Sequence, residues 1–160
     1  MSAGIQPFIS TVPGTLDGKG RVCIPAPFRH ILVSQATPGI YLCPSFVEPA
    51  LEAFGQTLID AVHARLSQQD PFFSATHDDE AAQVLAESML LPVDENGRIR
   101  VPDLMIQTAQ LKDKIVFVGL GQKFQIWDPD IYAPIKQERT DRARAARLAQ
   151  IRSSNGGLTQ

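Results

Sequence analysis

An aspartate followed four residues later by an arginine occurs twice in the chain, with turn-forming residues between. The first pair is Asp17 and Arg21 in Asp-Gly-Lys-Gly-Arg, and the second is Asp94 and Arg98 in Asp-Glu-Asn-Gly-Arg. A carboxylate at this spacing can bridge the turn and hold the guanidinium at a fixed angle. A single exposed pair of this kind is a turn-stabilising ion pair that contributes about 0–1 kcal/mol. Its duplication favours a functional role.

Further basic residues surround both pairs. Lys19 lies inside the first loop, and Arg100 follows the second loop by two residues. Arginines on a two-stranded ribbon suit contacts to phosphate, or bidentate contacts to guanine in the major groove of DNA. The sequence therefore predicts a compact basic surface for nucleic acid.

Enzyme motifs are absent from the sequence. It contains no G-x-S-x-G, no Walker loop and no G-x-G-x-x-G after a strand. Asp17 and Asp94 do not suit acid–base catalysis, because the arginine in each loop would keep both ionised. The histidines His30, His63 and His77 lack metal-ligand spacing. We expect no enzyme, no metal and no cofactor.

The two loops belong to an internal repeat, since Asp17 and Asp94 are 77 residues apart and residues 15–28 match 92–105. This predicts a duplicated small domain rather than a solenoid. Each copy predicts a strand, a tight turn and a second strand that ends at a proline. A short helix should follow, at about 26–33 and 103–110.

Other elements follow from apolar spacing. Strands are expected at about 40–43, 114–119 and 123–127, with a hairpin turn over 119–122. An apolar stripe at Leu51, Phe54, Leu58, Val62 and Leu66 predicts one amphipathic helix over 48–68. Further helices are expected over 78–88 and 129–152. Residues 153–157 should be disordered, and Cys23 and Cys43 should be buried free thiols.

The formal net charge of −2 at first argues against a nucleic-acid partner. Its distribution is uneven: residues 1–47 carry +2, 48–95 carry −9, 96–135 carry +1 and 136–160 carry +4. Such asymmetry indicates an interaction surface, although a solvated acidic helix and a solvated basic tail would explain it too. The longest apolar run is too short to span a membrane, and the first residues do not resemble a secretory signal. These features predict a cytoplasmic protein.

The chain resembles the MraZ family of bacterial transcriptional regulators over about residues 8–150. The resemblance rests on Leu-Asp-Gly-Lys-Gly-Arg-Val-Cys-Ile-Pro with Phe28-Arg29, on Asp-Glu-Asn-Gly-Arg-Ile-Arg-Val-Pro, and on Lys-Phe-Gln-Ile-Trp-Asp. It implies an α+β fold in which two AbrB-like (SpoVT-AbrB) swapped-hairpin halves form a pseudo-dimeric double-split β-barrel with flanking helices. The implied domains are residues 8–54 and 89–134, with connecting helices over 55–88 and a C-terminal helix and disordered tail over 135–160.

The resemblance also implies a function. It implies a cytoplasmic, nucleoid-associated repressor that recognises short direct repeats in double-stranded DNA upstream of its own division and cell wall operon. The implied oligomer is a ring, with an octamer or a larger ring as candidates. The family's DNA-contacting motif carries over to Asp17, Lys19, Arg21, Arg29, Asp94, Arg98 and Arg100.

Two features of the sequence leave other possibilities open. Family members usually carry a second-half arginine that matches Arg29, but this chain has Ile106 there. AbrB-like folds also serve as antitoxins that mask a toxin through a disordered tail, and the basic segment 136–152 fits that role. Antitoxin chains usually carry one such motif, whereas this chain carries two, which favours the repressor.

Overall fold

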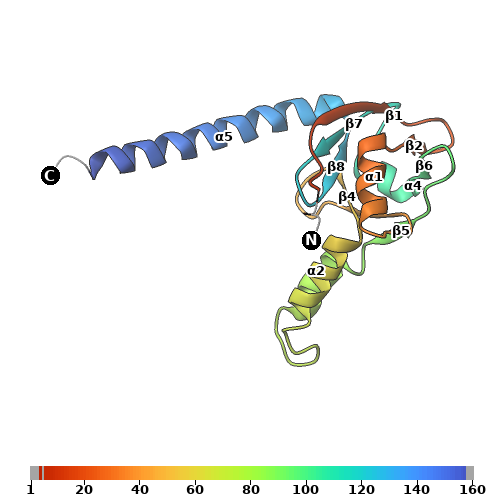
Figure 1. Ribbon diagram of the computed structural model, residues 1–160, viewed down its shortest axis with the longest axis horizontal. Coiled ribbons are helices and arrows are strands. Elements are labelled where there is room, and N and C mark those ends of the chain that lie inside the picture. Colours follow the sequence, from red (N-terminus) through yellow and green to blue (C-terminus); the bar gives the residue numbers. More distant parts are fainter. Residues whose placement is uncertain (1–3, 5, 158–160) are drawn as a thin grey trace. The chain divides into compact units, whose positions relative to one another are not determined.

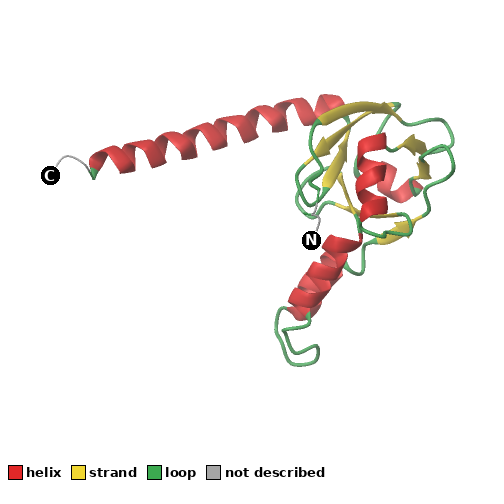
Figure 2. Cartoon of the chain, in the orientation of Figure 1, coloured by secondary structure: helices red, strands yellow, loops and turns green. Residues whose placement is uncertain are grey.

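The computed structural model describes residue 4 and residues 6–157, and it is an α+β protein with a mostly antiparallel sheet (Figure 2). The chain divides into two units, one ending at Asp128 and the other beginning at Pro129. No helix in the described part of the chain is long and apolar enough to cross a membrane.

The first unit contains two halves with the same order of elements (Figure 1). The first half consists of β1 (Thr11–Thr15), β2 (Arg21–Cys23), α1 (Ala26–Ser34), β3 (Ile40–Pro44) and β4 (Leu51–Phe54). The second half consists of β5 (Met89–Leu91), β6 (Arg98–Arg100), α4 (Asp103–Thr108), β7 (Lys114–Gly119) and β8 (Phe124–Trp127). Between them lie α2 (Gln56–Leu66) and α3 (His77–Val84), and the second unit is α5 (Pro129–Gly156).

The two halves exchange strands. The six-stranded sheet has the order β1-β7-β8-β4-β3-β5, and β2 pairs with β6 in a separate two-stranded sheet. The first strand of each half therefore pairs with the third strand of the other half, and β4 pairs with β8 at the centre. The order is unchanged when the halves are interchanged, as expected for a duplicated chain. Strand pairing among the described residues leaves β1 and β5 as edges, so the sheet is not closed into a barrel.

The two-stranded sheet, which we call the ribbon, repeats this symmetry at the level of single residues. Val22 lies opposite Ile99, which is its counterpart in the repeat, and both are 1% exposed. Because side chains alternate along a strand, the residues on either side of this central pair face outward. The ribbon thus has one face in the core and one face toward solvent.

Aromatic side chains from both halves meet in the core. Phe8, Phe28 of α1 and Phe124 of β8 pack with ring centroids 4.7 to 5.4 Å apart. Each ring is at most 2% exposed. Ring pairs at such distances add to the free energy gained by burying their apolar area. Since these side chains come from distant parts of the chain, the core holds the exchanged halves together.

The helix predicted over 48–68 is wrong in its first part. Leu51–Phe54 forms β4, which pairs with β3 and β8, and α2 begins only at Gln56. The spacing of Leu51 and Phe54 fits a helix, but it also fits a short strand buried on both faces. Pro49 and Gly55 delimit that strand, and both residues disfavour the interior of a helix.

Three smaller expectations also differ from the structure. The helix expected over 78–88 is α3, which ends at Val84. Residues 153–156, expected to be disordered, belong to α5, and residues 158–160 of the expected tail lie outside the described residues. Cys43 is buried, but Cys23 is exposed because it occupies an outward position of β2 next to the inward Val22. Both are free thiols.

The other elements confirm the predictions closely. The strands and short helices of both copies of the repeat are present, and β7 and β8 form the expected hairpin. The turn between them is closed by a hydrogen bond from the Leu120 amide to the Lys123 carbonyl.

Candidate nucleic-acid interface

The loop between β1 and β2 is organised by one carboxylate. Oδ1 of Asp17 accepts hydrogen bonds from the backbone amides of Lys19 (2.9 Å) and Arg21 (2.8 Å). Oδ2 accepts a hydrogen bond from Nε of Arg21 at 2.8 Å. The backbone closes the turn, since the Asp17 amide donates to the Arg21 carbonyl at 3.0 Å. The same carboxylate therefore both shapes the turn and orients the guanidinium of Arg21.

The loop between β5 and β6 has the same geometry. Oδ1 of Asp94 accepts hydrogen bonds from the amides of Asn96 and Arg98, each at 2.9 Å. Its Oδ2 accepts one from Nε of Arg98 at 3.2 Å. The Asp94 amide donates to the Arg98 carbonyl at 2.9 Å. The sequence repeat is thus also a repeat of one loop structure.

Both loops need a glycine at the same position. Gly20 and Gly97 each have φ of +78°, in the left-handed region that side chains other than glycine rarely occupy. In each loop this glycine amide donates to the aspartate carbonyl, at 3.1 and 2.9 Å. The positive φ therefore allows the chain to turn back toward the aspartate within five residues.

Hydrogen bonds keep both carboxylates ionised. The backbone amide of Arg21, together with the Arg21 side chain and the Lys19 amide, lowers the pKa of Asp17 below its ordinary value of 3.8. The backbone amide of Arg98 and that of Asn96 lower the pKa of Asp94 in the same way. Two groups held ionised by the same arrangement have no division of roles between acid and base. The loops are thus built to orient arginines.

Each loop is joined to the opposite half. The Ile24 amide donates to the Gly97 carbonyl, and the Val101 amide donates to the Gly20 carbonyl, both at 2.8 Å. These bonds extend the ribbon at its two ends, where strand pairing has stopped. The two loops are therefore parts of one rigid element rather than independent turns.

The outer face of the ribbon is basic. Arg21 lies opposite Arg100, and Cys23 lies opposite Arg98. These four residues alternate with the buried Val22 and Ile99. Lys19 is exposed in the first loop, and Arg100 is exposed on β6. The structure thus brings Asp17, Lys19, Arg21, Asp94, Arg98 and Arg100 together around one ribbon.

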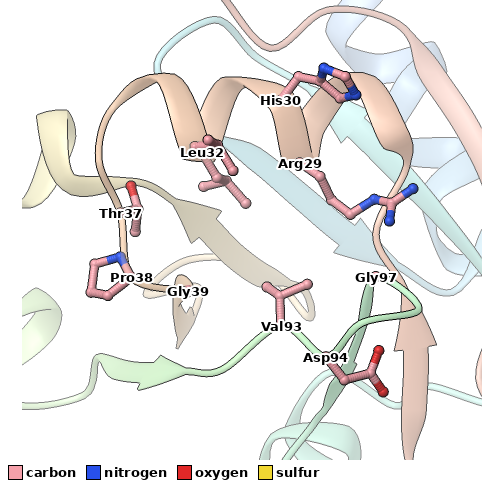
Figure 3. Close-up of a pocket in the computed structure, with 10 residues that line it drawn as sticks. Arg29, His30, Leu32, Thr37, Pro38, Gly39, Val93, Asp94 and Gly97 are labelled. Atoms are coloured by element: carbon pink, nitrogen blue, oxygen red, sulfur yellow. The ribbon is translucent and has the colours of Figure 1, made fainter.

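Arg29 lies outside the ribbon, on α1. It extends from that helix over the glycine of the second loop (Figure 3), where a Cβ atom on Gly97 would lie 2.5 Å from Cζ and 2.8 Å from Nε of Arg29. The equivalent position in the first loop is covered by Ile106, whose Cδ1 would lie 3.5 Å from a Cβ on Gly20. The helix of each half thus covers the loop of the other half.

Two functional features were not predicted from the sequence. The exchange of hydrogen bonds between loops depends on Gly20 and Gly97, and their identity at the same position of the repeat was the available signal. The position of Arg29 against Gly97 joins residues that are far apart in the chain, and local sequence patterns carry no such signal. Within the described residues, no group of three or more His, Cys, Asp or Glu side chains could hold a metal ion.

This fold and these loops define a class of protein, in which two duplicated α+β halves exchange strands and present one Asp–Arg loop each. The chain belongs to the MraZ family. The family described as "MraZ protein, putative antitoxin-like" matches residues 84–152.

Relatives with curated names match nearly the whole chain. A protein named transcriptional regulator MraZ from Xanthobacter autotrophicus is 39% identical over 142 residues, which cover 89% of this chain and 90% of that protein. Proteins of the same name from Gluconobacter oxydans and Gluconacetobacter diazotrophicus are 40% and 38% identical. They cover 86% and 94% of this chain, and the matches span 85% and 96% of those proteins.

Proposed function

We propose that this chain is a DNA-binding transcriptional regulator that contacts double-stranded DNA with the outer face of the ribbon and its two loops. The observation that carries the proposal is the pair of matching Asp–Arg loops joined in one two-stranded element. A two-stranded ribbon fits the major groove of B-form DNA. The names of the relatives support regulation of transcription as the use of that contact.

The residues have different proposed roles. Arg21 and Arg98 are oriented for contact, because an aspartate holds Nε of each and leaves the terminal amino groups to bind DNA. Asp17 and Asp94 are positioning residues. Lys19 and Arg100 are exposed and suited to phosphate.

Arg29 belongs to the proposed interface through its contact with the second loop. Its guanidinium covers Gly97, the residue immediately before Arg98. It therefore supports the loop whose arginine would contact DNA.

We also propose that the six-stranded sheet, which is open at β1 and β5, and the ribbon together make up a pseudo-dimeric double-split β-barrel. Three features support this arrangement. The first strand of each half pairs with the other half, β1 with β7 and β5 with β3. Matching strands of the two halves also pair with each other, β2 with β6 and β4 with β8. It would place two copies of the DNA-contacting loop on one side of a single chain, as a dimer of smaller chains would.

The proposed active form is a ring of eight or more copies that recognises short direct repeats upstream of its own operon and represses it. One chain offers few cations, and DNA affinity follows the number of phosphates neutralised. Several copies would match repeated sites and gain affinity through multivalency. Exposed apolar side chains, including Phe72 and Phe73 at 88% each, support self-association. The setting we propose is the cytoplasm and the nucleoid.

A DNA-binding measurement tests the proposal. Wild type and the Arg21→Ala/Arg98→Ala double variant would be compared by fluorescence anisotropy on DNA from upstream of the gene, and on shuffled DNA. Removing each arginine–base interaction should cost about 1–3 kcal/mol, so the double variant should no longer bind specifically. The salt dependence of wild-type binding should be steep, with a slope of about −0.9 per phosphate contact.

The matched control is Arg65→Ala, which removes an exposed arginine of α2 that pairs with Glu80. This variant also removes a positive charge, but Arg65 lies outside the ribbon, so DNA binding should persist. Binding retained in a folded double variant would contradict the assignment of the loops.

A second candidate function is antitoxin-like binding of a protein partner, which the description of the matching family favours. The long exposed helix α5, with its many arginines, would be the contact. This candidate predicts that partner binding survives the Arg21→Ala/Arg98→Ala substitutions that abolish DNA binding. The proposed repressor function predicts that regulation disappears together with DNA binding.

A further inference from the structure

A cavity of about 560 Å³ lies between α1 and the second loop (Figure 3). Leu32, Val33 and Val93 give it apolar walls, and Arg29 stands at one end with Asp94 and Gly97. Pockets for small molecules commonly measure about 300–1,000 Å³ and combine apolar walls with few polar groups. The size and lining of this cavity fit that description.

Arg29 supplies a cation to this cavity, and no ion pair of Arg29 is found within the part of the chain that the structure describes. Its Nε is buried and has no hydrogen-bond partner among the described residues. The nearby carboxylate of Asp94 is engaged by the amides of its own loop and by Nε of Arg98. A buried donor of a charged group that lacks a partner is costly. Nε itself is shielded from the cavity, so an anionic group there would meet the terminal amino groups of the Arg29 guanidinium, and these would donate charge-assisted hydrogen bonds to it.

The other half of the molecule shows that covering the loop does not require an arginine. Ile106 covers Gly20 just as Arg29 covers Gly97. Both glycines have the same φ of +78°, and both loops have the same hydrogen bonds. The charge of Arg29 is therefore not needed to build the loop, and a separate use for it is indicated.

We propose that this cavity binds a small molecule that carries one carboxylate or phosphate group on an apolar body. The acidic group would accept hydrogen bonds from Arg29, and the apolar body would lie along Leu32, Val33 and Val93. Because Asp94 and Gly97 line the same cavity, a bound molecule would hold the second loop. That coupling gives DNA binding a means of control and rests on the proposed function, whereas the binding itself does not.

Phenyl phosphate is a suitable probe for the full-length protein, compared with inorganic phosphate and benzyl alcohol by isothermal titration calorimetry. We expect saturable binding of phenyl phosphate that is tighter than that of either partial probe. Arg29→Met should weaken it about tenfold, as expected when a hydrogen bond from a charged group is removed. Val33→Glu, at a position that is 74% exposed, should weaken it too without risk to the fold.

Two controls separate this site from other arginines. Arg65→Met on α2 should bind phenyl phosphate like wild type. Arg21→Ala should also retain binding, although it impairs DNA binding. Since the assay contains no DNA, its result is independent of the proposed regulatory function.

Hydrogen exchange then tests the coupling within one molecule. Phenyl phosphate should slow exchange in residues 94–98 and leave residues 17–21, the matched loop without the cavity, unchanged. Equal protection of both loops would mean that the probe binds the Asp–Arg loops, and would overturn the proposal. Equal affinity of Arg29→Met and wild type, equal affinity for inorganic phosphate, or no saturable binding up to about 10 mM would overturn it as well.

Discussion

Arg21 of β2 lies directly opposite Arg100 of β6 in the ribbon. Like charges at opposite positions of an antiparallel pair destabilise it. Asp17 offsets the charge of Arg21 through a 2.8 Å ion pair, whereas no ion pair of Arg100 is found among the described residues. The repulsion between them would fall when a phosphate lies between the two side chains. If the ribbon contacts DNA as proposed, this pair lowers the stability of the free protein and favours binding of a phosphate.

Replacing Arg100 tests both effects, on stability and on DNA binding. Arg100→Thr should raise the free energy of unfolding by about 0.2–1 kcal/mol, because a cross-strand repulsion is removed. DNA binding should weaken, and the magnitude of the salt slope should fall by about 1, as expected when one arginine no longer neutralises a phosphate. Chemical denaturation and anisotropy at several salt concentrations measure the two effects. A variant that is less stable than wild type and binds DNA as before would contradict both expected effects of Arg100.

The counterpart of Arg100 in the repeat is Cys23, so the opposite change is available. Cys23→Arg would place an arginine opposite Arg98 and make the outer face of the ribbon symmetric. We expect lower stability and stronger binding to shuffled DNA at low salt, measured by chemical denaturation and anisotropy. The matched control is Cys23→Ser, which adds no charge and should leave DNA affinity unchanged.

The two loop glycines predict a difference in energetic coupling. Gly20→Ala and Gly97→Ala should each destabilise the protein by about 1–3 kcal/mol, because alanine is strained at positive φ. Only at Gly97 would the new Cβ displace Arg29. Gly97→Ala should therefore be non-additive with Arg29→Ala by about 0.5 kcal/mol or more, whereas Gly20→Ala should be additive. Unfolding of the single and double variants measures this, and additivity at both sites would refute the proximity of Arg29 and Gly97.

The lowered pKa values of Asp17 and Asp94 predict how the loops respond to acid. In each case the folded pKa lies below the ordinary 3.8, so the ionised form is favoured by the fold. The resulting stabilisation is fully present above pH 3.8 and disappears as the pH falls through the lowered folded value. The carboxyl carbon shifts of isotope-labelled aspartates would follow both groups. Asp17→Asn should remove the transition of Asp17 and leave that of Asp94. A pKa above 3.8 for either aspartate would be inconsistent with this geometry.

The loop between α2 and α3 predicts a contact between copies. Phe72 and Phe73 lie there, in the segment that extends from the sheet (Figure 1), and each is 88% exposed. Phe72→Ser/Phe73→Ser should lower the mass of the oligomer measured by light scattering, while the midpoint of thermal unfolding of the chain changes little. Leu104→Ser on α4, at 73% exposed, is the matched control and should leave the mass unchanged. An unaltered oligomer in the double variant would exclude this loop from the interface between copies.

The sequence alone was sufficient to predict the two loops. All of their hydrogen bonds to the aspartate side chains join residues at most four positions apart, so the pattern of aspartate, glycine and arginine contains the information needed to build them. The short helices after each proline were predictable for the same reason. The prediction that the two halves exchange strands came from the resemblance to the MraZ family, because the spacing of residues along the chain does not indicate it.

Local patterns failed where burial comes from distant partners. Leu51–Phe54 fits the stripe of a helix, but pairing with β3 and β8 makes it a strand at the centre of the sheet. Pairing with β3 joins residues that are near in the chain, but pairing with β8 depends on residues more than 70 positions away, such as Ile126 opposite Leu51. A window of local sequence does not contain β8, the partner that places this strand at the centre of the sheet.

The sequence by itself therefore determined the chemistry of each loop, because one carboxylate and one glycine shape a five-residue turn from within. Only the tertiary structure decided how the loops are combined. Exchange of strands sets Arg21 opposite Arg100 and brings Arg29 over Gly97. These contacts arise from burying Val22 and Ile99 in a shared core, which joins two halves that are distant in the chain.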